Sequence, residues 1–308
     1  MSLFLQQIAN GLVIGSTYAV VALGFALAFT VLRVINFAHP DIFMVGMFAG
    51  LVAAAPGPWG FVIALAGGAL GAAALGLALE RTVLAPLRGR DVLMTLIGTL
   101  GVAIMLENGM ALVAGPDPVS YPSLVPTRFI DIGSVTVTLR QLVNFAICLA
   151  LLALVSLYVR ATRFGRATRA IAERPDVAAA FGVDVGRVCQ VTIVIASAMA
   201  GVAAVSVGAL YGTASAFVGL LYGLKAFTCM LVAGNRYFEG VMVVALGLGI
   251  VEALVTGYVS SSLRDAVAFF VLIGVLLFRP NGLFGTREFT AFLPAGLRKK
   301  LMGKELLT

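Results

Sequence analysis

The sequence predicts an all-α polytopic integral membrane protein, and two observations carry this prediction. Of the 308 residues, 61% are hydrophobic and only 11% are charged, with a mean hydropathy of +1.06. Soluble domains carry roughly 25% charged residues, so this chain has too few polar groups to face water all round. The apolar residues also form long uninterrupted runs, whereas strands of membrane β-barrels are short and alternate in polarity. These features exclude a cytosolic globular enzyme, a disordered chain and a nucleic-acid-binding domain.

Nine apolar segments are candidates for membrane helices, because about 20 helical residues cross a hydrocarbon core of about 30 Å. They are 8–32, 36–55, 59–80, 92–114, 142–159, 188–210, 215–233, 240–259 and 263–279. Segment 36–55 begins with a polar run that contains Pro40, which favours a broken or half-inserted helix. Segment 215–233 carries Lys225 near its middle. We therefore expect eight to ten crossings within one transmembrane domain, residues 1–308.

Basic residues are concentrated in alternate loops. If Arg33, 81–91, 160–187, 234–239 and the tail after 279 share one side, that side holds 17 of the 21 Lys and Arg residues. The positive-inside rule then places the C-terminus in the cytoplasm and the N-terminus outside. This asymmetry also accounts for most of the net charge of +7 without an anionic ligand.

The expected external loop, 115–141, is rich in proline, which favours extended backbone over helix. Within it, 135–139 could form a small strand. The loop is either a surface for an external partner or a simple connector.

The cytoplasmic loop 160–187 reads RATRFGRATRAIAERPDVAAAFGVDVGR. Pro175 suits the first turn of a helix, Gly182 suits its end, and Asp184 could cap the next helix. We expect one or two short helices under the membrane, either as a solvated basic connector or as an element that docks into a soluble ATPase. The D-x-A-A-x-x-G pattern resembles the coupling loop of ABC import permeases. The candidate coupling residues are Arg166, Arg169, Glu173, Asp176, Ala178, Ala179 and Gly182.

Five fragments together resemble the H-type permeases of branched-chain amino acid ABC transporters, the LivH-like family. They are GLVIGSTYA (11–19), LRVINFAH (32–39), FGRATRAIAERPDVAAAFG (164–182), LKAF (224–227) and FRPNGLFG (278–285). Two departures stand out: Pro40 replaces a glycine that usually follows the histidine, and AGNRYFEG (233–240) replaces a glycine-rich stretch.

The resemblance implies one permease subunit of an ATP-driven importer in the bacterial cytoplasmic (inner) membrane. Its partners would be a second, homologous permease, two cytoplasmic ATP-binding subunits that use ATP and Mg, and a periplasmic substrate-binding protein. The cargo would be a branched-chain or related small amino acid; urea or a small carboxylate is the alternative.

The chain itself is predicted to be no enzyme and to bind no cofactor. It contains no G-x-x-x-x-G-K-[ST] sequence, so ATP would be bound by partners. His39 is the only histidine, which excludes a multi-histidine metal centre, and Cys148, Cys189 and Cys229 lie in apolar segments as packing residues. The missing H-E-x-x-H pattern argues against an intramembrane enzyme.

Ionisable groups inside a bilayer are costly and require a reason. The candidates for a translocation path or gate are Asn36, His39, Asp41, Glu107, Asn108, Lys225 and Glu252. Lys225 could pair with Glu252 or with Glu107, either to fix helix register or to line a polar path. A relay through Glu107, Lys225 and Glu252 would instead suit an ion-coupled secondary transporter, which is the alternative function.

Overall fold

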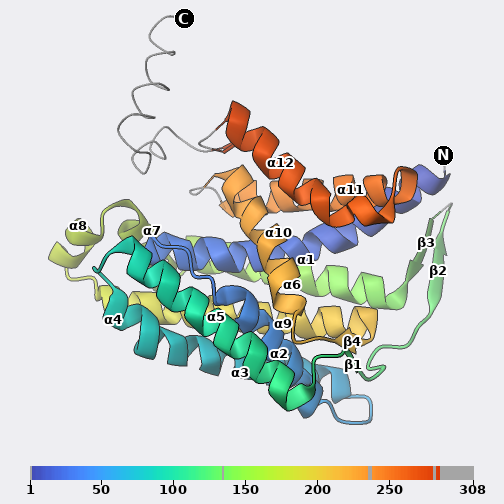
Figure 1. Cartoon of the computed structure of the whole chain (residues 1–308), viewed down its shortest axis with the longest axis horizontal. Helices are drawn as coiled ribbons and strands as arrows, with labels where there is room; N and C mark the ends of the chain where they lie inside the picture. Colours follow the sequence, from blue (N-terminus) through green and yellow to red (C-terminus); the bar gives the residue numbers. More distant parts are fainter. Residues whose placement is uncertain (1, 134, 235–237, 280–281, 285–308) are drawn as a thin grey trace, which may run out of the picture.

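The computed structural model describes residues 2–133, 135–234, 238–279 and 282–284. Within these residues the chain is almost entirely helical (Figure 1). The long helices are α1 (Ser2–Leu32), α2 (His39–Ala53), α3 (Gly60–Leu79), α5 (Val92–Ala114), α6 (Leu139–Ala161), α9 (Val185–Tyr211), α10 (Val218–Ala233), α11 (Phe238–Tyr258) and α12 (Arg264–Phe278). Each coincides with one of the nine expected segments. The all-α polytopic prediction is thereby confirmed.

Seven helices in the described part are long and apolar enough to cross a membrane. The two apolar helices that fall short are α2 and α10, the same segments whose polar residues marked them as irregular. An irregular stretch, 33–38, precedes α2, so this helix begins three residues later than the apolar run. The side on which each terminus lies stays a prediction.

Short elements connect the long helices. A π-helical turn, η1 (Glu80–Leu84), continues α3 into α4 (Ala85–Leu87), and a 3₁₀ turn, η2 (Ser261–Leu263), precedes α12. Two short helices, α7 (Arg163–Glu173) and α8 (Pro175–Ala180), occupy the loop expected in the cytoplasm. They lie at the opposite end of the molecule from the β2–β3 hairpin (Figure 1).

The proline-rich loop forms small sheets, as expected for 135–139. The strands β2 (Phe129–Ile132) and β3 (Val135–Thr138) pair antiparallel, with Phe129 opposite Thr138. The strands β1 (Val119–Ser120) and β4 (Thr213–Ala214) pair likewise and tie this loop to the α9–α10 connection. A capping box formed by Thr138 and Gln141 then begins α6.

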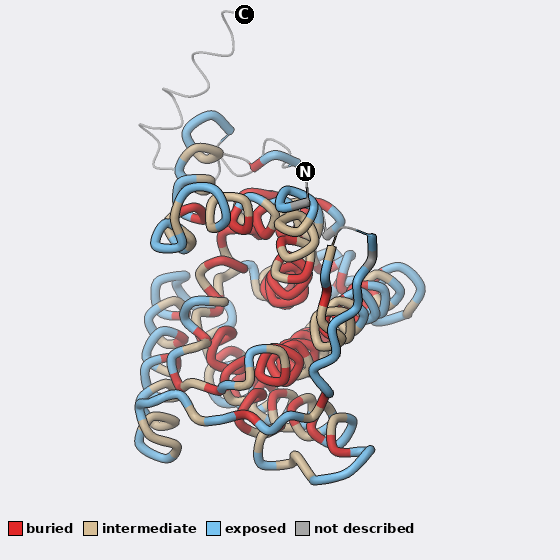
Figure 2. The backbone as a smooth tube through the Cα atoms, turned by 90° about the vertical axis from the view of Figure 1, so that its right-hand side faces the viewer, coloured by how far each residue is buried: buried red, intermediate tan, exposed pale blue. Residues whose placement is uncertain are grey.

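Small residues allow the central helices to pack closely. A Cβ atom at Gly15 of α1 would lie 2.8 Å from the Ala245 carbonyl oxygen of α11, and one at Gly46 of α2 would lie 2.5 Å from Gly201 Cα of α9. Backbones approach this closely only where side chains are absent or small. As a result α1 and α9 are the most buried spans. Figure 2 shows the buried positions in the interior of the helix assembly and the exposed ones on its rim.

Candidate functional site

The turn before α2 is built by local hydrogen bonds. Asn36 accepts a hydrogen bond from the Ala38 amide at 3.1 Å through its Oδ1, and its carbonyl accepts one from the His39 amide at 3.2 Å. Arg33 adopts a left-handed conformation (φ 54°) that reverses the chain after α1. Pro40 lies in the first turn of α2, where its missing N–H is not needed. Asn36 thus shapes the start of α2.

His39 is buried against α1. Its ring meets the Phe25 ring edge-on, with centroids 4.8 Å apart. A Cβ atom at Gly24 would lie 2.5 Å from His39 Nε2, so the glycine leaves the space that the imidazole fills. This nitrogen has no hydrogen-bond partner among the described residues. His39 does not line the cavity described next.

A cavity of about 180 Å³ lies between α1, α2, α5 and α10. Two carboxylates line it, Asp41 from α2 and Glu107 from α5. The remaining lining is apolar: Phe25, Phe37, Pro40, Leu100, Ala103, Ile104, Leu220, Gly223, Leu224 and Phe227. The cavity therefore brings together two of the seven residues that the sequence analysis assigned to a path or gate.

Two glycines of α10 permit its close approach to the start of α2. A Cβ atom at Gly219 would lie 2.6 Å from the Pro40 carbonyl oxygen and 3.2 Å from Asp41 Oδ1. One at Gly223 would contact the Pro40 ring. The proline that departs from the family pattern is thus accommodated by glycines on the neighbouring helix.

Asn108 does not share the cavity with its neighbour Glu107. Successive residues on a helix point about 100° apart. Asn108 is exposed, and its side chain donates a hydrogen bond to the Ile104 carbonyl of its own helix at 2.8 Å. Asn108 is therefore not among the described residues that line the cavity.

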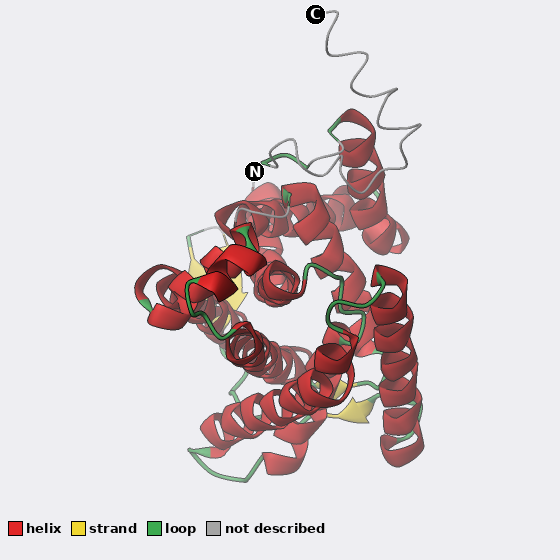
Figure 3. Ribbon diagram, turned by 90° about the vertical axis from the view of Figure 1, so that its left-hand side faces the viewer, coloured by secondary structure: helices red, strands yellow, loops and turns green. Residues whose placement is uncertain are grey.

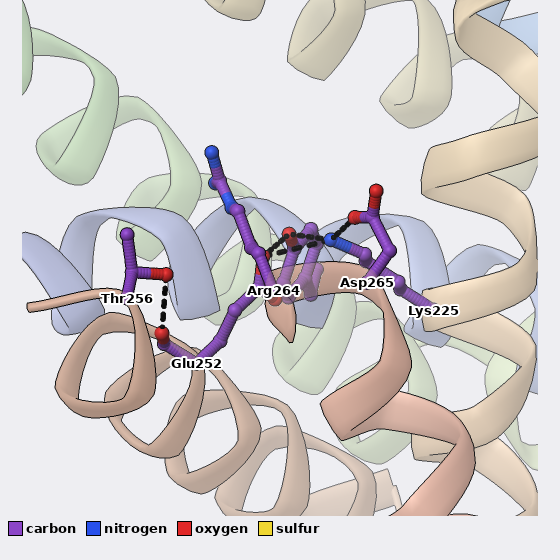
Figure 4. Close-up of polar contacts among 6 residues, drawn as sticks. Lys225, Glu252, Thr256, Arg264 and Asp265 are labelled. Atoms are coloured by element: carbon purple, nitrogen blue, oxygen red, sulfur yellow. Dashed lines mark hydrogen bonds and ion pairs between the residues drawn. The ribbon is translucent and has the colours of Figure 1, made fainter. Parts of the chain in front are cut away.

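Lys225 and Glu252 form a buried ion pair, with Nζ and Oε1 2.7 Å apart. The Lys225–Glu252 pairing is therefore confirmed, whereas the alternative pairing with Glu107 is wrong, because Lys225 faces α11 and α12 instead of the cavity. Lys225 also pairs with Asp265 at 2.8 Å, and Arg264 Nε donates to Glu252 Oε1. Figure 4 shows Lys225, Glu252, Arg264 and Asp265 converging at the start of α12.

Tyr18 of α1 completes this ion network. Lys225 Nζ donates to its hydroxyl at 3.1 Å, and the hydroxyl donates to Glu252 Oε1 at 3.2 Å. The network holds two cations and two carboxylates, so its formal charge is zero, and it joins α1, α10, α11 and α12. The sequence analysis did not place Tyr18, Arg264 or Asp265 in such a network; the adjacent Arg and Asp at the start of an apolar run were the available signal.

The α7–α8 unit, residues 163–182, presents one exposed face and one packed face. Arg166, Arg169, Glu173, Asp176, Ala179 and Gly182 are exposed, as a docking surface requires. Ala178 is the exception, because it is buried against Ile171 and Val188. Ala178 thus packs α8 onto α7 and α9, and its place among the candidate coupling residues stays a prediction. Phe181, directly after α8, is 86% exposed, a feature that the sequence analysis missed.

Local caps shape this unit as the sequence predicts. Pro175 lies in the first turn of α8, Gly182 has φ +82°, and the Asp184 side chain accepts from the Arg187 amide at the start of α9. The Asp184 cap and the Gly182 turn are thereby confirmed. Figure 3 looks at the molecule from the side on which α7 and α8 lie.

Polar contacts tie the α7–α8 unit to three membrane helices. The Arg33 guanidinium, at the end of α1, donates to the Ala172 and Glu173 carbonyls at 2.5 and 2.9 Å, and so satisfies free groups at the C-terminus of α7. The Thr168 hydroxyl of α7 lies 3.1 Å from that of Thr192 on α9 and 3.5 Å from that of Tyr158 on α6. Hydrogen bonds therefore join α7 to α1, α6 and α9.

The fold matches that of a solved transporter chain. Over 89% of this chain and 87% of the other, the structure superposes on an ABC transporter of the metal-chelate type in an inward-facing conformation, with a TM-score of 0.51 and 18% sequence identity. The two chains thus share their fold.

The family follows from the sequence comparisons. Residues 7–276 match the model of the branched-chain amino acid transport system permease component. The permease LivH of Escherichia coli is 35% identical over 92% of this chain and 96% of its own length, and BraD of Pseudomonas aeruginosa is 34% identical over 92% and 97%. The chain belongs to the LivH-like family of branched-chain amino acid transport permeases. It is a multi-pass protein of the inner membrane, and as a permease component it is not itself the ATPase.

Of the family departures, 233–240 lies partly outside the described residues, which omit 235–237.

Proposed function

We propose that this chain is one of two homologous membrane subunits of an ATP-driven importer of branched-chain or related small amino acids. The observation that carries the proposal is the α7–α8 unit, whose outer face is exposed while its inner face is bonded to α1, α6 and α9. Such a unit can bind a soluble partner and transmit that partner's conformational change to the membrane helices.

The partners follow from this role. Two cytoplasmic ATP-binding subunits, using ATP and Mg, would dock on the α7–α8 unit of each permease, and a periplasmic binding protein would deliver the cargo to the opposite end. Ala179 and Phe181 offer a small and a projecting apolar side chain for a groove on the ATP-binding subunit. Arg166 and Arg169 would lie at its rim, where charged groups steer association more than they hold it.

The mechanism is alternating access without covalent chemistry in this chain. Closure of the two ATP-binding subunits would press on α7 and α8, and the Arg33 and Thr168 contacts would transmit the movement to α1 and α9. Asp41 and Glu107 would line the path. Asn36 and His39 would fix the start of α2 beside it. Lys225 and Glu252 would hold the surrounding helices, and Asn108 would lie outside the path.

Co-purification tests the proposal. ATP-binding subunits should purify with this chain, and their ATPase activity should rise when the binding protein and leucine are added together. Uptake into vesicles by this chain alone, abolished by an uncoupler, would instead establish the ion-coupled secondary transporter and overturn the proposal.

A further inference from the structure

Two carboxylates face the cavity between α1, α2, α5 and α10 without a counter-charge. Asp41 is only 5% exposed, and Glu107 is half-buried. Among the described residues, neither side chain forms an ion pair or a hydrogen bond with another side chain, and no lysine or arginine lines the cavity. In the described part of the chain, the other two buried carboxylates are paired, Glu80 with Arg88 and Glu252 with Lys225.

An unpaired buried carboxylate is costly, and either a bound proton or a cationic partner relieves that cost. The ion network at α12 cannot supply one, because its two cations already contact its own two carboxylates. A cationic partner for Asp41 would therefore come from outside the described chain.

The rest of the cavity wall is apolar and indicates that the partner also carries an apolar group. Phe25, Leu100, Ile104, Leu224 and Phe227 offer aliphatic and aromatic surface. A volume of about 180 Å³ lies below the roughly 300–1,000 Å³ of pockets for drug-sized ligands, and so suits a molecule of amino-acid size.

We propose that this cavity is a substrate-binding site, here called the substrate station, that recognises the α-ammonium of an aliphatic amino acid. The ammonium lies between Asp41 and Glu107, and the branched side chain lies against the apolar wall. This inference rests on the proposed function and adds the site and its polarity. Because none of the described lysines or arginines lines the cavity, this wall binds the ammonium and makes no ion pair with the α-carboxylate.

Cysteine protection tests the station in the assembled transporter, without the binding protein. An Ile104→Cys substitution places a thiol in the cavity wall, where Ile104 is exposed, while the native Cys148, Cys189 and Cys229 are fully buried. Leucine and 3-methylbutylamine, which keeps the ammonium, should slow maleimide labelling. The acid 4-methylpentanoate, which lacks it, should leave the rate unchanged. A Leu112→Cys thiol on the same helix, at a position 89% exposed, reports labelling changes unrelated to the cavity.

Charge removal supplies the second arm. In the Ile104→Cys background, Asp41→Asn with Glu107→Gln should raise the leucine concentration for half-protection by about tenfold to a hundredfold, the effect of losing a charged hydrogen bond. Asp117→Asn, an exposed carboxylate of the outer loop, should leave it unchanged. If the double variant does not assemble, Glu107→Gln alone carries the test, because that side chain is only half-buried.

Protection by 4-methylpentanoate equal to that by the amine, or unchanged protection in the charge variants, would overturn the station. So would the absence of any protection by leucine. In these cases ATP-driven leucine uptake with the binding protein would persist if the proposed function is right, so the two failures are distinguishable.

Discussion

Removal of the Lys225 ammonium tests the ion network as a structural clamp. Lys225→Met keeps most of the volume but deletes contacts to Glu252, Asp265 and Tyr18 at 2.7, 2.8 and 3.1 Å. Glu252, whose side chain is 1% exposed, retains Arg264 as a partner, whereas Asp265 is 61% exposed and returns to solvent. Breaking a buried pair costs about 3–5 kcal/mol, and we expect the lower end, about 3 kcal/mol, because Arg264 remains.

The comparison of three variants makes the magnitude specific. Glu252→Gln should cost more than Lys225→Met, because it leaves both cations with only Asp265 to balance them. Asp265→Asn alone should cost about 0–1 kcal/mol, as for an exposed pair. In the Lys225→Met background Asp265→Asn should cost nothing further, since Glu252 and Arg264 then form a neutral pair.

The assay is the free energy of unfolding in mixed detergent micelles, with leucine uptake per assembled complex measured beside it. A clamp predicts lowered stability with normal uptake in the complexes that do assemble. Lys225→Met and Glu252→Gln both within about 0.5 kcal/mol of the parent would refute the reasoning. Lost uptake in a fully stable, assembled Lys225→Met complex would make the network part of the path.

Three further predictions concern the coupling unit and the helix contacts. Ala179→Arg should abolish ATP-driven uptake while the permease pair still assembles, because a long charged side chain replaces a small one on the docking face. The control is Ser120→Arg, at an exposed position at the opposite end of the molecule. Retained uptake in Ala179→Arg would contradict the docking assignment. Arg33→Ala should lower the amount of leucine moved per ATP hydrolysed, since α7 loses the donor that ties it to α1. Arg81→Ala, at an exposed position between α3 and α4, should leave that amount unchanged. An unchanged amount of leucine per ATP in Arg33→Ala would count against this linkage. Gly223→Val should lower the free energy of unfolding by about 1–3 kcal/mol more than Gly247→Val does. The reason is that a Cβ atom at Gly223 would meet the Pro40 ring, whereas one at Gly247 would have nothing within 4 Å. Equal losses in the two variants would refute the close packing of α10 on α2.

Much of the fold could be predicted because the bilayer leaves few alternatives. A chain in lipid must satisfy its backbone hydrogen bonds internally, so long apolar runs become helices, and α1, α3 and α9 lie where the runs do. The irregular segments were also visible, since Pro40 and Lys225 interrupt the apolar pattern. The π-helical turn at Glu80–Leu84 was not, because its local sequence does not differ from that of a helix.

The candidate site was predictable only in part. The need of a buried charge for a partner identified Lys225 and Glu252 as a pair, but the extension to Arg264 and Asp265 depends on how α12 packs on α11. Composition marked Ala178 and Ala179 alike as small residues, and only the packing of α8 on Ile171 separates the buried one from the exposed one. Adjacent polar residues such as Glu107 and Asn108 point to different sides of one helix, which sequence proximity conceals.

The most direct test of the central claim is a cross-link from the α7–α8 unit to an ATP-binding subunit. Phe181→Cys places a thiol at its most exposed apolar side chain, and Ser120→Cys places one at the opposite end of the molecule. In the assembled transporter, a bifunctional thiol reagent should join Phe181→Cys to an ATP-binding subunit and leave Ser120→Cys uncoupled from it. A fully active transporter that yields no such cross-link, or yields it from Ser120→Cys instead, would contradict the account.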